Sequence, residues 1–469
     1  MKLNKKFLAV AAAGALTVAT AVPALALENE FHGAFTSFYD LSNYSAAGNN
    51  AFETNPTSDR GLRKNAPTEN YFVQRVRLGY TAKASESVKL VTNFELDYNW
   101  LGNSSYTTGR GSGGAIGADS VNIETKNLYL ELNYPTYVNA KLGMMGNTDA
   151  FKGTIFDADM AGVLLSHNYA NAGVTAGFFR WNDTWDWTND RTLGKGTVDL
   201  LQLDGRYNIT KDIKVGAAYY YIQDSRANGS TTTVTPVGPQ TGVTADGTPV
   251  YGSVTTTTTA NPSNDARVHS IGINAEGVVG PVTINGFALA QFGDLSATQK
   301  AKGYEFNLGA KMALLGGTAR SEFLYVAGGN HSLYNAATGT EAGGFYDSEL
   351  IILGRDKNAT TIDNAIVYDV SNYRQGVILG SLGYDHPCTD RITSSVNAGF
   401  AAIANDKFAS YKGGKGNYLG TEINTESNYK LTPNVTLGAR AGYVFLGDYF
   451  DGLNADNPYD LKIIAKYVF

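Results

Sequence analysis

Apolar and polar residues alternate over long stretches of this chain, which is the pattern of a β-strand with one face in an apolar environment. Every second position from Leu461 to Phe469 is apolar, and Lys462 and Lys466 stand between them. The same alternation recurs over 88–100 and over 304–314. Successive side chains of a strand point to opposite faces, so each of these segments has one apolar face and one polar face.

Eighteen segments of this kind can be placed along the chain. Many reach or exceed the roughly 9–11 residues that a tilted strand needs to cross a bilayer. They span 28–39, 70–84, 88–101, 122–134, 138–146, 161–169, 172–182, 197–207, 212–223, 266–278, 281–293, 303–315, 318–327, 374–385, 390–404, 416–429, 434–446 and 458–469.

The connections between these segments alternate between short and long. The long ones are polar and lie near 40–69, 102–121, 147–160, 224–265 and 328–373. Transmembrane barrels sort their connections in this way, with tight turns at one rim and longer loops at the other. Because backbone groups in lipid need internal partners, such a sheet must close on itself. The prediction is an all-β fold, a single antiparallel up-and-down transmembrane β-barrel over 27–469, with about 18 strands and 16 to 20 compatible with the pattern.

Aromatic residues mark the ends of the predicted strands, which supports the membrane assignment. Tyrosine stands at or near the short-turn end of seven of them, and aromatic belts are typical of both membrane–water interfaces. These tyrosines are Tyr80, Tyr134, Tyr169, Tyr207, Tyr384, Tyr429 and Tyr467. Beyond residue 26 no run of 18 consecutive apolar residues occurs, so no membrane-spanning helix is predicted.

The first 26 residues have the organisation of a secretory signal peptide. Three lysines precede an Ala-rich apolar stretch, which ends in the cleavage-like motif Ala24-Leu25-Ala26. The alternative is an N-terminal transmembrane anchor. Removal of the three lysines takes the formal net charge from −6 to −9, and this acidity argues against a nucleic-acid partner.

Composition offers little support for catalysis or for a resident metal. The single cysteine excludes a disulfide framework and any site built on several cysteines. The five histidines are scattered, and none has the spacing of a metal site or of a nucleophile–histidine pair. The protein is therefore predicted to be no enzyme and to need no cofactor or metal.

The chain resembles the Gram-negative outer-membrane porin superfamily of large 16- to 18-stranded barrels. The resemblance rests on the alternating last strand that ends in Phe469, on the Tyr-ended hairpins and on the signal peptide. It implies an outer-membrane location among lipid and lipopolysaccharide, with Tyr467 and Phe469 read by the barrel-insertion machinery. It also implies a homotrimer and a water-filled channel for passive diffusion of small hydrophilic solutes.

Selectivity of such a channel depends on the charges that line it. The inward faces of all the predicted strands carry 13 basic and 10 acidic residues, so the acid excess falls in loops and turns, and a weak cation preference is expected. The residues selected as pore-lining are Arg75, Arg77, Lys89, Glu95, Asp97, Glu131, Lys141, Asp204, Arg206, Glu305, Lys311, Arg320, Glu322 and Arg440.

The resemblance further implies that the connection 147–160, after the fifth strand, folds inward and narrows the pore. Asp149, Asp157 and Asp159 would then face Arg75 and Arg77 across a constriction. Opposed charges across a pore create a transverse field that orients dipolar solutes. The alternative is that these three acids lie in a solvated loop.

Two other functions are compatible with a barrel of this kind. One is a scaffold or sheath for partner proteins, such as cytochromes in an electron conduit, which requires a wide lumen with no inward loop. The other is an adhesin or receptor that acts through the long external loops.

Overall fold

The computed structural model describes thirteen parts of the chain, which include the predicted barrel wall except for Leu101 and Asn122. The predicted signal peptide 1–26 and the predicted loop 102–121 lie outside the described residues. The described residues are 28–44, 62, 64–100, 123–183, 196–225, 230–236, 240–243, 249–251, 254–260, 266–334, 346–357, 365–406 and 416–469.

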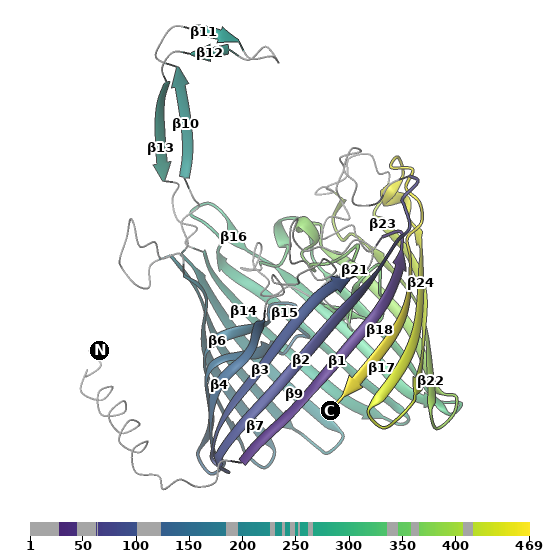
Figure 1. The fold of residues 1–469 in the computed structure, drawn as a ribbon. Helices are drawn as coiled ribbons and strands as arrows, with labels where there is room; N and C mark the ends of the chain where they lie inside the picture. Colours follow the sequence, from purple (N-terminus) through teal and green to yellow (C-terminus); the bar gives the residue numbers. More distant parts are fainter. Residues whose placement is uncertain are drawn as a thin grey trace, which may run out of the picture.

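Eighteen long antiparallel strands form one closed barrel, as the alternation predicts (Figure 1). The short strand β16 (Lys300–Ala301) pairs only with the end of β15. The barrel strands are β1 (Glu28–Ser42), β2 (Glu69–Ser85), β3 (Val88–Trp100), β4 (Glu124–Tyr134), β5 (Val138–Thr148), β6 (Asp157–Asn168), β7 (Ala172–Asp183), β8 (Thr197–Asn208), β9 (Ile213–Asp224), β14 (Ala266–Val279), β15 (Val282–Asp294), β17 (Tyr304–Leu314), β18 (Gly317–Val326), β21 (Val377–Pro387), β22 (Ile392–Ala402), β23 (Tyr418–Lys430), β24 (Val435–Leu446) and β25 (Tyr459–Val468).

The first and last strands pair with each other and so close the barrel. Their register runs from Ala34 opposite Val468 to Ser42 opposite Asp460. Beyond it, Phe469 donates its backbone N–H to Gly33 at 3.0 Å and accepts the N–H of Gly33 at 2.8 Å. A Cβ on Gly33 would lie 2.4 Å from the Phe469 ring, so this close approach requires glycine.

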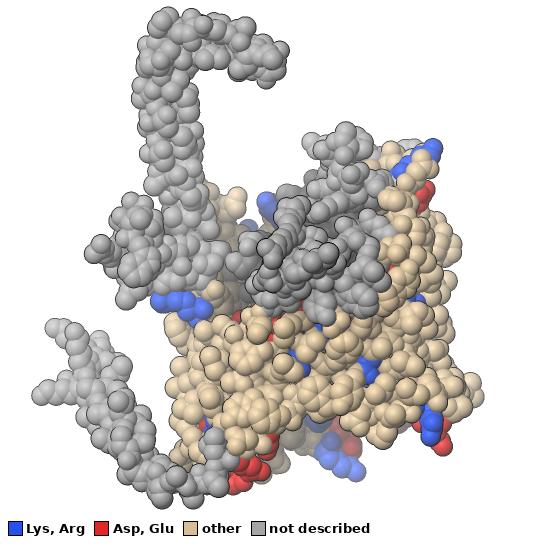
Figure 2. Space-filling model, in the orientation of Figure 1, with Lys and Arg blue, Asp and Glu red and all other residues tan. Residues whose placement is uncertain are grey.

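Side chains alternate between the outer surface and the lumen, and β17 shows this clearly. Phe306 and Leu308 are 43% and 57% exposed, whereas Glu305 and Asn307 between them are 1% and 4% exposed. The exposed set is apolar and the enclosed set is polar, as a strand between lipid and water requires. The visible barrel wall in Figure 2 is accordingly mostly free of Lys, Arg, Asp and Glu. None of the helices in the described chain is long and apolar enough to cross a membrane.

The two rims of the barrel differ. Short turns join the strands at the lower rim in Figure 1, where β1 begins, and the longer connections lie at the upper rim. The connection 224–265 contains the paired strands β10 (Ser230–Pro236) and β13 (Val254–Ala260), and β11 (Gln240–Val243) and β12 (Pro249–Tyr251). The connection 328–373 contains β19 (Asp347–Ser348) and β20 (Arg355–Asp356), which pair in parallel.

Two segments from the long-loop rim fold back into the lumen. We call 149–156 the first inward segment and 346–357 the second inward segment. Their apolar side chains, among them Phe151, Ile155, Leu350 and Leu353, are fully buried in one cluster with lumen-facing apolar residues of the wall. The large hydrophobic core of this protein therefore lies inside the barrel, where these segments meet the wall.

Candidate functional site

The first inward segment is shorter than the predicted connection 147–160. The β5–β6 ladder continues as far as the pair Thr148 and Asp157, so only 149–156 leaves the sheet. The prediction was wrong for Asp157 and Asp159, which belong to β6 rather than to a loop. The sequence did not reveal this because Asp has a low strand propensity, and here cross-strand pairing overrides it.

The first inward segment contacts distant strands across the lumen. Its Ala150 N–H donates to the Tyr220 hydroxyl of β9 at 2.8 Å. The Phe151 ring packs on Phe287 of β15, with 5.6 Å between centroids. A Cβ on Gly272 of β14 would lie 2.5 Å from that same ring, so the segment is packed tightly against this wall.

Two polar contacts extend the first inward segment to β17 and β18. The Thr154 hydroxyl donates to Glu305, and the Lys152 ammonium forms an ion pair with Glu322. The Lys152 ammonium also lies 5.7 Å from the ring centroid of Tyr346, in the second inward segment. Lys152 therefore joins both inward segments to one side of the wall.

Asp149 holds the shape of the first inward segment. Its carboxylate accepts the backbone N–H groups of Phe151, Gly153, Ile155 and Phe156 at 2.6 to 3.0 Å. Burial raises the pKa of Asp149 to about 6, although these four donors act in the opposite direction. The role of this residue is to satisfy the backbone of a tight enclosed loop.

The three predicted constriction acids do not form an acidic front opposite Arg75 and Arg77. Asp149 binds its own loop, Asp157 accepts the Thr148 hydroxyl at 2.6 Å, and Asp159 lies 2.5 Å from the Lys126 ammonium. Asp149 and Asp159 are thus engaged by groups other than Arg75 and Arg77, and Asp157 contacts the neighbouring strand. The group that the first inward segment presents to solvent is the Lys152 ammonium, with 41% of its side chain exposed.

The wall formed by β2 to β5 carries a ladder of charges that pair along the wall. Arg75 lies 2.6 Å from Asp97, and Arg77 lies 2.5 Å from Glu95, each directly opposite its partner in the β2–β3 register. Farther along, the Lys89 ammonium lies 3.3 Å from the carboxylate of Glu131. The ladder ends at Lys141, whose ammonium stands 5.2 Å from the Tyr129 ring centroid.

Lys126 belongs to this wall and is absent from the predicted set. Strict alternation places it on the same face as the exposed Leu128 and Leu130. A register shift between β3 and β4 at this point turns it toward Glu95 and Asp159 instead. A bulge of this kind re-aims a side chain, and nothing in the sequence marks its position.

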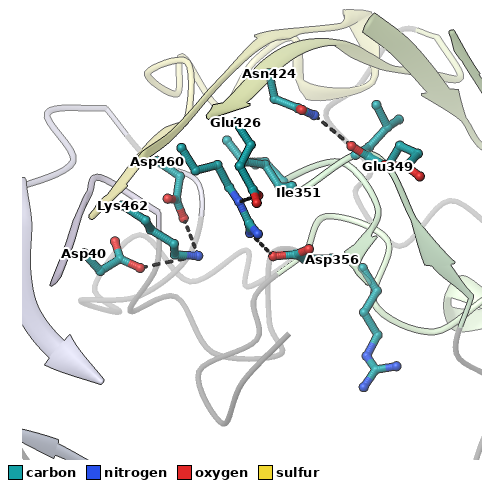
Figure 3. A network of polar contacts seen from close by, with 12 residues as sticks. Asp40, Glu349, Ile351, Asp356, Asn424, Glu426, Asp460 and Lys462 are labelled. Atoms are coloured by element: carbon teal, nitrogen blue, oxygen red, sulfur yellow. Dashed lines mark hydrogen bonds and ion pairs between the residues drawn. The ribbon is translucent and has the colours of Figure 1, made fainter. Parts of the chain in front are cut away.

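The second inward segment is fixed to β23 by a buried carboxylate and a neighbouring amide. Glu422 of β23 accepts the backbone N–H groups of Ile351, Ile352 and Leu353 at 2.7, 3.0 and 2.7 Å. Asn424 donates to the carbonyl of Glu349 at 2.9 Å (Figure 3). An acidic side chain of the wall thus replaces the hydrogen-bond partners that the enclosed backbone lacks.

Two arginines of the wall complete this attachment. Arg440 lies 2.7 Å from Glu426 on the neighbouring strand and forms a second ion pair with Asp356 of the second inward segment. Arg320 donates twice to Asp385 at 2.8 Å and lies 3.0 Å from Glu349. Both were predicted to line the pore, whereas the acids supplied by the second inward segment were not predicted.

The remaining predicted pore-lining residues lie on the lumen face at other heights. Asp204 accepts the Tyr220 hydroxyl at 2.6 Å, and Arg206 donates to Asn168 at 2.6 Å. Lys311 stands opposite Arg320 in the register of β17 and β18, and it is exposed.

A further ion-pair cluster, also missed in part, joins the first and last strands. The Lys462 ammonium lies 3.5 Å from Asp40 and 3.1 Å from Asp460 (Figure 3). Asp40 falls in the predicted connection 40–69, whereas in the structure it belongs to β1, which continues to Ser42. In the described residues, no group of three or more His, Cys, Asp or Glu is placed to hold a metal ion.

The sequence matches no protein-family model and no curated protein sequence. Solved structures of bacterial proteins, among them the outer membrane protein opdK of Pseudomonas aeruginosa, share its architecture at low sequence identity. OccK5 (OpdH) of Pseudomonas aeruginosa is 13% identical with a TM-score of 0.52, over 94% of this chain and 98% of that one. OccAB1 of Acinetobacter baumannii is 9% identical with a TM-score of 0.53, over 94% and 96%. OccK2 (OpdF) of Pseudomonas aeruginosa, solved with glucuronate, is 11% identical with a TM-score of 0.52, over 94% and 98%. The chain thus has the closed eighteen-stranded barrel fold of the outer-membrane porins.

Proposed function

We propose that the protein is an outer-membrane porin, a passive channel for small hydrophilic solutes. The observation that carries this proposal is the combination of an apolar outer wall with a charged lumen inside one closed barrel. A closed barrel with apolar side chains outside spans lipid, and a polar interior passes water and solutes. The shared fold of several outer-membrane channels supports this function.

A weak cation preference is part of the same proposal. The acid excess of the chain supports it, because cations concentrate at an acidic rim. The paired charges of the lumen wall counteract each other, so the preference is small and declines as salt screens the rim charges. The resemblance to porins supports three further proposals, namely homotrimer formation, contact with lipopolysaccharide, and recognition of Tyr467 and Phe469 by the insertion machinery.

The test is a planar-bilayer measurement on the purified mature chain. Stepwise conductance and a small cation-selective reversal potential in a potassium chloride gradient are expected. Absence of conductance steps in repeated reconstitutions would reject the channel function, and a strongly anion-selective potential would reject the cation preference alone.

The two inward segments weigh against a sheath for partner proteins. That function requires a wide lumen, and here buried contacts hold 149–156 and 346–357 inside the barrel. Purification of the barrel with bound haem proteins would instead favour the sheath over the passive channel. An adhesin or receptor role depends on the tips of the long loops. It is tested by measuring whether cells that display the barrel bind a surface or ligand that cells without the barrel do not bind.

A further inference from the structure

A cavity of about 450 Å³ lies between the second inward segment and the wall formed by β18 and β21 to β25. We call it the lower chamber, because Asp385, Asn428 and Lys466 place it toward the short-turn rim. Its roof includes Glu349 and Ile351 of the second inward segment. A solute that crosses the barrel on this side therefore meets a cavity with a mostly polar lining.

The charges of the lower chamber balance. Four basic and four acidic residues line it, which are Arg320, Lys357, Arg440 and Lys466 against Glu349, Asp356, Asp385 and Glu426. Three of the bases are held in ion pairs, since Arg320 binds Asp385 and Glu349, Arg440 binds Glu426 and Asp356, and Lys357 lies 2.7 Å from Glu349. At these three bases a charged ligand would have to compete with an existing ion pair, and only Lys466 among the lining bases is outside the pairs named here.

The rest of the lining consists largely of amides and hydroxyls. Asn397 donates to Asn424 at 2.7 Å, and Asn428 donates to Glu426 at 2.6 Å, so neighbouring groups orient these amides. Thr393 and Ser395, which alternate onto the same face as Asn397, also line the chamber. Amides and hydroxyls offer both donors and acceptors, and no described lining residue is aromatic.

We propose that the lower chamber is a binding subsite for small uncharged polyhydroxylated solutes of monosaccharide size. Each hydroxyl of such a solute donates and accepts, which matches a wall of mixed donors and acceptors with no net charge. The chamber selects by hydrogen bonding rather than by charge or ring stacking. This inference rests on the proposed porin function, and it names the solute class that the lumen retains.

The experiment compares three sugars of nearly equal size and different charge, which are glucose, glucosamine and glucuronate. Saturation-transfer NMR on the detergent-solubilised full barrel measures binding without any need for conduction, and block of single-channel current measures binding during passage. The expected result is stronger binding of glucose than of either charged sugar in both assays. Equal or stronger binding of glucuronate or glucosamine would overturn the inference.

Matched variants locate the binding. Thr393→Val removes a chamber hydroxyl and keeps its shape, and it is expected to weaken glucose binding about threefold, the effect of one neutral hydrogen bond. Thr283→Val, on the lumen face of β15 and outside the chamber, is expected to leave binding unchanged. Equal effects of the two substitutions would contradict the assignment.

A charge variant tests the balance itself. Asp385→Asn leaves the chamber with one net positive charge and is expected to raise glucuronate binding relative to glucose. An unchanged ratio would contradict the role of charge balance. Conductance without glucose binding rejects this inference and leaves the porin proposal in place, whereas glucose binding without conductance rejects only the porin.

Discussion

The carboxylate of Glu422 on β23 accepts the backbone N–H of Leu353 at 2.7 Å, and two neighbouring N–H groups bind the same carboxylate. Glu422 is fully buried, so water cannot replace these bonds. One wall side chain therefore determines where the second inward segment lies in the lumen.

Replacement of Glu422 by alanine should release the second inward segment. Hydrogen bonds to a charged group contribute about 1.5–3 kcal/mol each, so the joint loss of three of them should detach the segment from β23. Single-channel recordings of Glu422→Ala should show larger or noisier conductance, and limited proteolysis should cut within 346–357. Glu276→Ala serves as control, because it removes an exposed lumen carboxylate that pairs with Lys214 near the short turns. Identical recordings from both variants would contradict the role of Glu422.

Replacement of Arg77 by glutamine should shift selectivity toward cations. Its side chain is 45% exposed, so its charge reaches passing ions. A unit charge contributes about 1 kcal/mol to an ion roughly 4 Å away in water, and salt reduces this effect. The reversal potential should move most at low salt. Arg391→Gln removes a basic charge from a short turn at the rim rather than from the lumen wall, and it should move the potential less.

The first inward segment should become less stable as pH rises from about 4 to about 6. The raised pKa of Asp149 means that the folded site prefers the protonated carboxyl, so ionisation weakens this site by up to about 3 kcal/mol. The loss begins near the ordinary pKa of 3.8 and is complete above about 6. Amide hydrogen exchange in 149–156, corrected for its intrinsic pH dependence, should increase over this interval. Asp149→Asn should abolish the increase, and a persistent increase would assign it to another group.

Gly272→Ala should displace the first inward segment. The new Cβ would lie 2.5 Å from the Phe151 ring and 2.7 Å from the Ala288 carbonyl oxygen, which is closer than packing permits. Lower thermal stability and altered conductance are expected. Gly205→Ala provides the control, since its nearest neighbour would be 3.9 Å away. Unchanged thermal stability and conductance in Gly272→Ala would contradict tight packing of the first inward segment against β14.

Phe469→Ala should reduce the yield of folded barrel. Its ring stacks on Tyr467 at 5.3 Å on the outer surface, and its backbone closes the pairing with β1. The folded fraction can be read from heat-modifiable migration on gels. Phe445→Ala removes a ring of similar exposure elsewhere on the outer surface. An equal loss of folded barrel in both variants would mean that Phe469 contributes only the lipid contact of any exposed ring.

The barrel wall could be predicted from the sequence because lipid imposes strict alternation on every strand. In β17, the apolar side chain of Phe306 predicts the outer surface, and the polar side chain of Glu305 predicts the lumen face. Interior contacts carry no such signal. The inward direction of Lys126 depends on a bulge, and the roles of Asp149 and Glu422 depend on which backbone groups fold back to meet them. The sequence therefore identified wall charges such as Arg320 and Arg440, but not the second inward segment, which pairs with them.

The pairing of β1 with β25 has a consequence for assembly. The Ser42 hydroxyl donates to the carbonyl of Tyr459, 417 positions away, and no strand between them can take the place of either partner. The seam is thus the contact with the greatest sequence separation in the wall, and contacts of this kind form late because they require the entire chain. Until the ten-residue strand β25 pairs with β1, both edges of the sheet have unpaired backbone groups that can pair with strands of other chains. A chain cut short before β25 is therefore expected to accumulate as an aggregation-prone open sheet rather than as a smaller pore.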